Sequence, residues 1–158
     1  MIKTLTFAAA ALATVALASP SFAQSFSPST GNLSGSGVVQ LQQTTNVNCN
    51  VSITASPGAT SRPIPTRSIS AGDFLCIAVA PYGSWSANVV PGSTTSISLT
   101  IGANTVANDP CYGTVVVAWD NATRTATFNN NVLPPVNSGG LNCTIVSGSI
   151  RIPGLQIL

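Results

Sequence analysis

The sequence is most informative for the residues that it lacks. The 158-residue chain contains no histidine, and its charged residues are five Lys plus Arg and three Asp plus Glu. The only lysine is Lys3, near the N-terminus, and all three acidic residues are aspartates. Histidine is the usual general base near neutral pH, and lysine is the amine of Schiff-base catalysis. Because the common acids, bases and amine nucleophiles are missing, we predict that the protein is not an enzyme and binds no cofactor.

The three aspartates, Asp73, Asp109 and Asp120, do not form a recognisable catalytic pair or metal site. Each lies next to a Gly, Pro or Asn, where aspartate commonly shapes a turn. A glycosidase needs two carboxyl groups placed across one bond, and a calcium loop needs several oxygen ligands at close spacing. We therefore predict no catalytic residues and no metal ligands, and we assign the aspartates to turns.

The N-terminal residues 1–23 have the three-part pattern of a secretory signal peptide. Lys3 provides the positive start, residues 5–18 form an apolar run, and residues 21–23 (Ser-Phe-Ala) fit a processing site. A membrane anchor is the alternative, but the run is shorter than the ~20 residues that span a bilayer. We predict cleavage before Gln24, export across a bacterial inner membrane, and one secreted domain over residues 24–158 with no transmembrane segment.

The predicted mature chain carries very little charge, namely four Arg and three Asp. A net charge close to zero gives no electrostatic basis for binding nucleic acid or an anionic membrane. It also gives weak protection against self-association, and no lysine is left to shield the edge of a sheet. We therefore expect the partner to be a second copy of the chain or an apolar surface, and not a nucleic acid.

Four cysteines remain after the predicted cleavage: Cys49, Cys76, Cys111 and Cys143. An even number of cysteines in an exported chain indicates two disulfides. The alternative is a zinc site, but the ligands of structural zinc sites usually come in close pairs, and these cysteines are far apart in the sequence. The segments from Cys49 to Cys76 and from Cys111 to Cys143 hold strands and turns in a similar order. This weak similarity favours these two pairings among the three that are possible.

Period-two alternation of apolar and polar residues runs through most of the sequence. It is clear in residues 47–54, 96–101 and 123–128, which indicates strands with one buried face. Residues 74–80 and 115–119 are apolar on both faces and are the candidates for central strands.

Pro and Gly separate these segments into about nine or ten short strands. We predict an all-β fold, an antiparallel β-sandwich or partly open barrel, in which residues 24–36 form a flexible arm.

Two further features suggest contact surfaces. Tyr82 and Trp85 are large side chains that either pack in the core or form an exposed aromatic pair. The C-terminal residues 150–158 remain apolar to the end of the chain, and they could form an edge strand, a strand donated to a second copy, or part of the protein's own core. Pro153 argues against a central strand.

An ordered series of short motifs gives the chain a resemblance to a known family. The segments are Phe26 to Pro28, Asn48-Cys49, Phe74 to Cys76, Pro81 to Trp85, Cys111 to Val115, Trp119 to Thr123, Phe128 to Asn130 and Asn142 to Gly148. In these segments the sequence resembles the alkane-oxidation activator (PraA/PraB-type) small secreted proteins of Gram-negative bacteria. The resemblance implies an exported, non-enzymatic protein associated with growth on hydrophobic substrates, and it supplies no binding residues.

The sequence thus predicts a secreted structural or interfacial protein of the cell surface or biofilm matrix that contacts hydrophobic substrates such as alkanes. One alternative is a self-assembling fibre or pilus-like subunit, although the C-terminus lacks the penultimate aromatic residue usual in chaperone-assembled pilins. A second alternative is a carbohydrate-binding module that uses exposed aromatic side chains.

Overall fold

The computed structural model describes residues 23–158, so the predicted signal peptide lies, except for Ala23, outside the described residues. The described chain is built from strands and one short 3-10 helix, η1. The elements are β1 (Phe26–Ser27), β2 (Leu33–Gln42), β3 (Asn46–Ala55), β4 (Ser61–Ile64), β5 (Thr66–Ala71), η1 (Phe74–Ala78), β6 (Ala80–Pro81), β7 (Trp85–Val89), β8 (Ser96–Asn104), β9 (Pro110–Asp120), β10 (Thr125–Leu133), β11 (Cys143–Arg151) and β12 (Gln156–Ile157).

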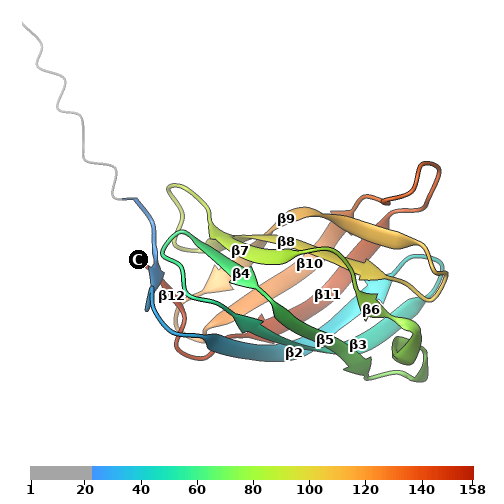
Figure 1. Ribbon diagram of the computed structural model, residues 1–158, viewed down its shortest axis with the longest axis horizontal. Coiled ribbons are helices and arrows are strands. Elements are labelled where there is room, and N and C mark those ends of the chain that lie inside the picture. Colours follow the sequence, from blue (N-terminus) through green and yellow to red (C-terminus); the bar gives the residue numbers. More distant parts are fainter. Residues whose placement is uncertain (1–22) are drawn as a thin grey trace, which may run out of the picture.

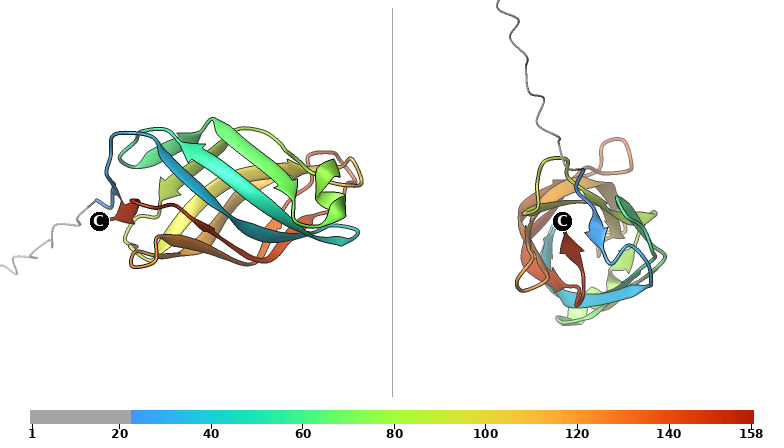
Figure 2. Two further views of the ribbon diagram at one scale, coloured as in Figure 1. Left: turned by 90° about the horizontal axis from the view of Figure 1, so that it is seen from below. Right: turned by 90° about the vertical axis from the view of Figure 1, so that its left-hand side faces the viewer.

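The main sheet curls into a nearly closed barrel (Figure 1; Figure 2, right). Its strands follow the order β4-β7-β8-β9-β10-β11-β2-β3-β5, and β6 pairs with β8 beside this path. Every pairing is antiparallel. The predicted all-β antiparallel fold is therefore confirmed, and of the two predicted architectures the partly open barrel is the one observed.

Alternation along each strand gives the barrel its single apolar interior. In β3, the side chains of Val47, Cys49, Val51 and Ile53 are buried, and the intervening polar side chains face outward. The residues of β9 follow the same rule: Val115 and Val117 are buried, whereas Val116 is 56% exposed. Residues 115–119 are central as predicted, since β9 pairs with β8 and with β10, but only one of its two apolar faces is buried because the barrel has a single interior.

Two glycines allow β2 and β11 to approach closely where the sheet bends. A Cβ atom on Gly37 would lie 1.8 Å from the carbonyl oxygen of Ser149, so no other residue fits at this position. Gly148 has a φ of 139°, and the register of β11 against β2 shifts between Ile145 and Ser147. Irregularities of this kind bend a strand and help a sheet to close.

An arginine bridges the seam between the two ends of the sheet, β4 and β5. The guanidinium of Arg67 donates to the carbonyl oxygens of Ile64 (3.2 Å) and Pro65 (3.3 Å), and also to that of Gly83. It lies 6.0 Å from the ring centroid of Trp85. These contacts join β5 to the β4 side of the barrel without strand pairing.

Both termini of the described chain close one mouth of the barrel. β1 pairs with β12 across this mouth (Figure 2, right), and Phe26, Leu155 and Ile157 are buried there. The interpretation of residues 24–36 as a flexible arm is not supported, since this segment contains β1 and the start of β2. Of the options for the C-terminal residues, packing into the protein's own core is the one observed.

The segment 74–80, which the sequence predicts as a central strand, differs most from expectation. It forms η1 followed by Val79 and the start of β6. Cys76 and Val79 are buried, but Phe74, Leu75 and Ile77 face solvent. A turn of 3-10 helix places only every third side chain on the same side, so most of this apolar run points away from the barrel.

Candidate interaction surface

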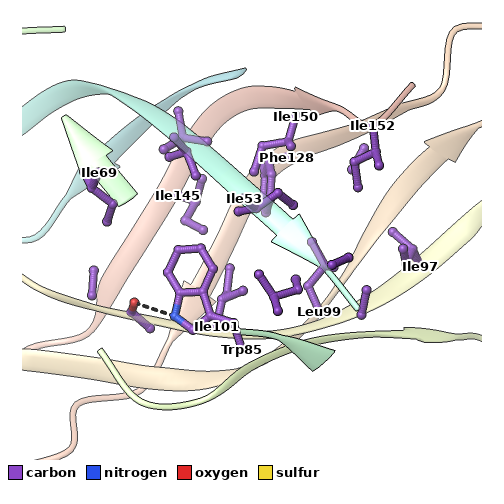
Figure 3. Close-up of a pocket in the computed structure, with 18 of the residues that line it drawn as sticks. Ile53, Ile69, Trp85, Ile97, Leu99, Ile101, Phe128, Ile145, Ile150 and Ile152 are labelled. Carbon is purple, nitrogen blue, oxygen red and sulfur yellow. Dashed lines mark hydrogen bonds between the residues drawn. The ribbon is translucent and has the colours of Figure 1, made fainter. Parts of the chain in front are cut away.

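The predicted aromatic contact pair does not exist as a surface feature. Trp85 is only 7% exposed, and its indole N–H donates to the carbonyl oxygens of Tyr82 and Gly102, at 3.0 Å each. Figure 3 shows the indole inside the barrel among aliphatic side chains such as Ile101 and Ile145. Trp85 is a core residue because both the ring and its single donor are satisfied there.

Tyr82, the other member of the pair, lies at the surface. It is 37% exposed and makes an edge-to-face contact with Tyr112, with 6.3 Å between the ring centroids. The hydroxyl of Tyr112 donates to the carbonyl oxygen of Ser84 at 2.7 Å, which fixes this contact against the bend between β6 and β7. Tyr82 is therefore a packed, half-covered side chain on the barrel wall.

The interior of the barrel contains a small cavity lined by apolar atoms (Figure 3). Its volume is about 60 Å³. An engineered apolar protein cavity of about 150 Å³ stays dry and takes up benzene, so this one is well below the size that holds even that small molecule. The interior is therefore a packed core that is too small for a ligand of that size.

Three exposed large apolar side chains of the described residues lie close together in the sequence, namely Phe74, Leu75 and Ile77 on η1. We call these three residues the apolar tip. They are 81%, 40% and 70% exposed, respectively. Single exposed apolar residues are normal on a protein surface, whereas three within four positions concentrate exposed apolar area on one short element. The apolar tip lies at the end of the barrel opposite β1 and β12, on the short green coil in Figure 1.

The apolar tip is held on a rigid backbone. The disulfide between Cys49 and Cys76 attaches η1 to β3, with both sulfur atoms buried. The Asp73 carboxylate accepts hydrogen bonds from the backbone N–H (2.7 Å) and side-chain amide (3.0 Å) of Asn48. Within the turn, the N–H of Cys76 donates to Asp73 and that of Val79 donates to Cys76, each at 3.0 Å. Because the disulfide and the Asp73 contacts fasten η1 to β3, the three apolar side chains stay in solvent.

The second disulfide joins Cys111 in β9 to Cys143 at the start of β11. The structure therefore has the two pairings that the sequence favours, with Cα–Cα distances of 5.5 Å for Cys49–Cys76 and 5.9 Å for Cys111–Cys143. Cys143 follows the loop after β10. The two bridges therefore fasten different segments, η1 in one case and the end of this loop in the other. Only the first bridge contacts the apolar tip.

Sequence comparison identifies the family. A family model described as alkane oxidation protein activator PraA/PraB-like matches residues 1–157. The chain belongs to this family. No curated protein and no solved structure matches it. The description names an activator of alkane oxidation, which is compatible with a role outside catalysis.

The aspartates of this PraA/PraB-like protein each organise a separate loop. Asp109 accepts from the side chains of Gln43 and Asn137 and from the N–H of Leu141. Asp120 accepts from the N–H of Ala122 at 2.7 Å, and this hydrogen bond is the main reason that its pKa is lowered. Together with Asp73 beneath the apolar tip, they occupy the turn positions that the sequence predicts.

Residues 23–158, the part of the chain that the structure describes, hold neither a clustered metal-ligand set nor a membrane-spanning helix. No group of three or more His, Cys, Asp or Glu side chains is arranged to hold a metal ion in this part of the chain. It also contains no helix with the length and apolar character needed to cross a membrane.

Sequence reasoning missed the apolar tip because it treated residues 74–80 as one buried strand. Two local signals could have identified it. Gly72-Asp73 is a turn sequence immediately before the run, and Cys76 divides the run at its centre. A cysteine committed to a disulfide has to point inward, and in a tight turn its neighbours then have to point outward.

Proposed function

We propose that this PraA/PraB-like protein is a secreted, non-enzymatic interfacial protein that contacts hydrophobic substrates such as alkanes through the apolar tip. The observation that carries this proposal is the exposure of Phe74, Leu75 and Ile77 on a backbone fixed by a disulfide. The family description supports it, since an activator of alkane oxidation that lacks the usual catalytic groups needs a way to meet the alkane.

The exposed area is sufficient for reversible adsorption. Full burial of a large aliphatic or aromatic side chain is worth about 1.5–3 kcal/mol, and scaling by the exposed fractions gives roughly 3–6 kcal/mol for the apolar tip. Because the backbone is already fixed, little of this free energy is lost in ordering the segment on contact. A single copy therefore binds an apolar surface weakly, and several copies on one cell or matrix bind it durably.

Secretion is supported by the residues on both sides of the predicted cleavage site. Residues 1–23 have the signal-peptide pattern, and the described chain contains two disulfides, Cys49–Cys76 and Cys111–Cys143. Disulfides of this kind persist in oxidising compartments outside the cytoplasm. An extracellular location also places the apolar tip where hydrophobic nutrients are met.

The two alternatives suggested by the sequence receive less support from the observed contacts. The carbohydrate-binding hypothesis depends on an exposed aromatic pair, and Trp85 is buried. The hypothesis of a donated C-terminal strand needs a strand free to leave, and β12 is paired with β1 in its own chain.

The proposal is tested by adsorption of the purified mature protein to hexadecane droplets. The test variant is Phe74→Thr/Leu75→Thr/Ile77→Thr. The matched control is Val38→Thr/Val116→Thr/Val132→Thr, which changes three valines that are half exposed on the barrel flank (50%, 56% and 50%). Circular dichroism and urea unfolding establish that both variants are folded.

We expect the tip variant to lose at least ten-fold in droplet affinity, whereas the flank variant stays within two-fold of the wild type. Equal losses in both variants, or none in either, would overturn the proposal.

A further inference from the structure

We infer that the apolar tip selects an uncharged hydrocarbon surface over an anionic phospholipid bilayer. This inference rests on the proposed function, and it adds the identity of the surface. The formal charges of the described residues, 23–158, are distributed unevenly relative to the apolar tip.

Three of the four arginines lie at the end of the barrel opposite the apolar tip. The guanidinium of Arg62 donates to the carbonyl oxygens of Gly31 (3.3 Å) and Ser56 (3.1 Å) at the end of the barrel that β1 and β12 close. Arg124 and Arg151 also lie at this end, beside the turn between β9 and β10: Arg151 donates to the carbonyl oxygen of Thr123, and the carbonyl oxygen of Arg124 accepts from the N–H of Ile152. The remaining arginine, Arg67, lies on the barrel wall with its guanidinium bound to three carbonyl groups.

The end that carries the apolar tip is acidic. Asp73 immediately precedes η1. Asp109 lies in the turn between β8 and β9, and this turn is at the same end because Asn104 pairs with Ala80, two residues after η1. The end of the barrel that carries the apolar tip therefore has two negative charges, whereas three of the four arginines lie at the other end.

This distribution of charge affects binding to an anionic bilayer more than binding to hydrocarbon. Each Lys or Arg close to an anionic membrane strengthens binding about five-fold, and anchors of modest apolar area depend on such residues for stable attachment. The apolar tip lacks this contribution, and Asp73 and Asp109 are repelled by acidic headgroups. A hydrocarbon surface presents no charged headgroup, so the full apolar contribution of the tip remains available there.

The experiment compares binding of the mature protein to hexadecane droplets and to vesicles of phosphatidylglycerol and phosphatidylcholine (1:1), in 20 mM and 150 mM salt. The charge variant is Ala78→Lys/Ala80→Lys, which adds two cations at exposed positions beside the apolar tip. The matched control is Ala59→Lys/Ala122→Lys, which adds two cations at exposed positions in the β3–β4 and β9–β10 connections.

We expect the wild type to bind droplets and to bind the vesicles at least ten-fold more weakly. The Ala78→Lys/Ala80→Lys variant should gain at least ten-fold in vesicle binding in 20 mM salt and lose most of that gain in 150 mM salt. The control variant, Ala59→Lys/Ala122→Lys, should show no comparable gain. Equal affinity of the wild type for droplets and vesicles would overturn the selectivity and leave the proposed function standing. Binding to neither would overturn both.

Discussion

Removal of the disulfide beneath the apolar tip should loosen the tip as well as destabilise the fold. The perturbation is the double variant Cys49→Ala/Cys76→Ala. The bridge closes a loop with a sequence separation of 27 residues, for which the chain-entropy model gives a stabilisation of about 3.5 kcal/mol. Domains of ordinary size have unfolding free energies of about 5–15 kcal/mol, so the variant should fold with a much reduced margin.

The second disulfide provides a control of nearly equal magnitude. Cys111→Ala/Cys143→Ala opens a loop with a separation of 32 residues, which corresponds to about 3.7 kcal/mol. The two variants should therefore lose similar amounts of stability in urea unfolding followed by tryptophan fluorescence. They should differ at the apolar tip, because only Cys76 belongs to η1.

The assay that separates them is hydrogen exchange under native conditions. The amides of residues 76 and 79 donate within the η1 turn, and they should exchange faster in the first variant than in the second. The first variant should also bind droplets several-fold more weakly, since it has to order the tip on contact. Equal exchange of these two amides in the two variants, or a stability loss below about 1 kcal/mol in both, would refute the reasoning.

Three further predictions concern stability and processing. Arg62→Met removes donors from the carbonyl groups of Pro28, Gly31 and Ser56, and should lower the unfolding free energy in urea by about 3 kcal/mol; a change within error would contradict this. The pKa of Asp120 is lowered in the folded state. The ionised carboxylate therefore stabilises the folded protein above the pKa that it has in the unfolded chain, and this stabilisation is lost as the pH falls through the folded-state pKa. Asp120→Asn should therefore be less stable than the wild type at pH 7, and the difference should shrink as the pH falls through the pKa of Asp120 in the folded protein. Secreted protein should begin at Gln24, or within two residues of it, by N-terminal mass spectrometry, and retention of Met1 would be the contrary result.

The sequence predicted most reliably the features that depend on local pattern. Strict alternation in residues 47–54 and 96–101 placed β3 and β8 correctly, because each strand has one apolar face and the barrel has one interior. The turn at residues 120–122 is also as predicted, with the Asp120 carboxylate accepting from the N–H of Ala122.

The features that sequence missed depend on contacts between distant segments. Nothing near Trp85 reveals that the carbonyl oxygens of Tyr82 and Gly102 satisfy its indole N–H inside the barrel. The pairing of β1 with β12 joins the two ends of the described chain, so neither segment alone indicates it. The apolar tip was missed for a related reason: composition identifies residues 74–80 as apolar, but only the Cys49–Cys76 bridge and the Asp73–Asn48 contacts turn them outward.

The most direct test of the account is whether the apolar tip itself enters hydrocarbon. The native tryptophans, Trp85 and Trp119, are buried, so an added tryptophan reports separately on its own position. Phe74→Trp places the reporter on the tip, and Val116→Trp places it on the barrel flank. On addition of hexadecane droplets, we expect the emission of the Phe74→Trp protein to shift to shorter wavelength and that of the Val116→Trp protein to stay unchanged. A shift in the Val116→Trp protein without one in the Phe74→Trp protein, or no shift in either, would contradict the account.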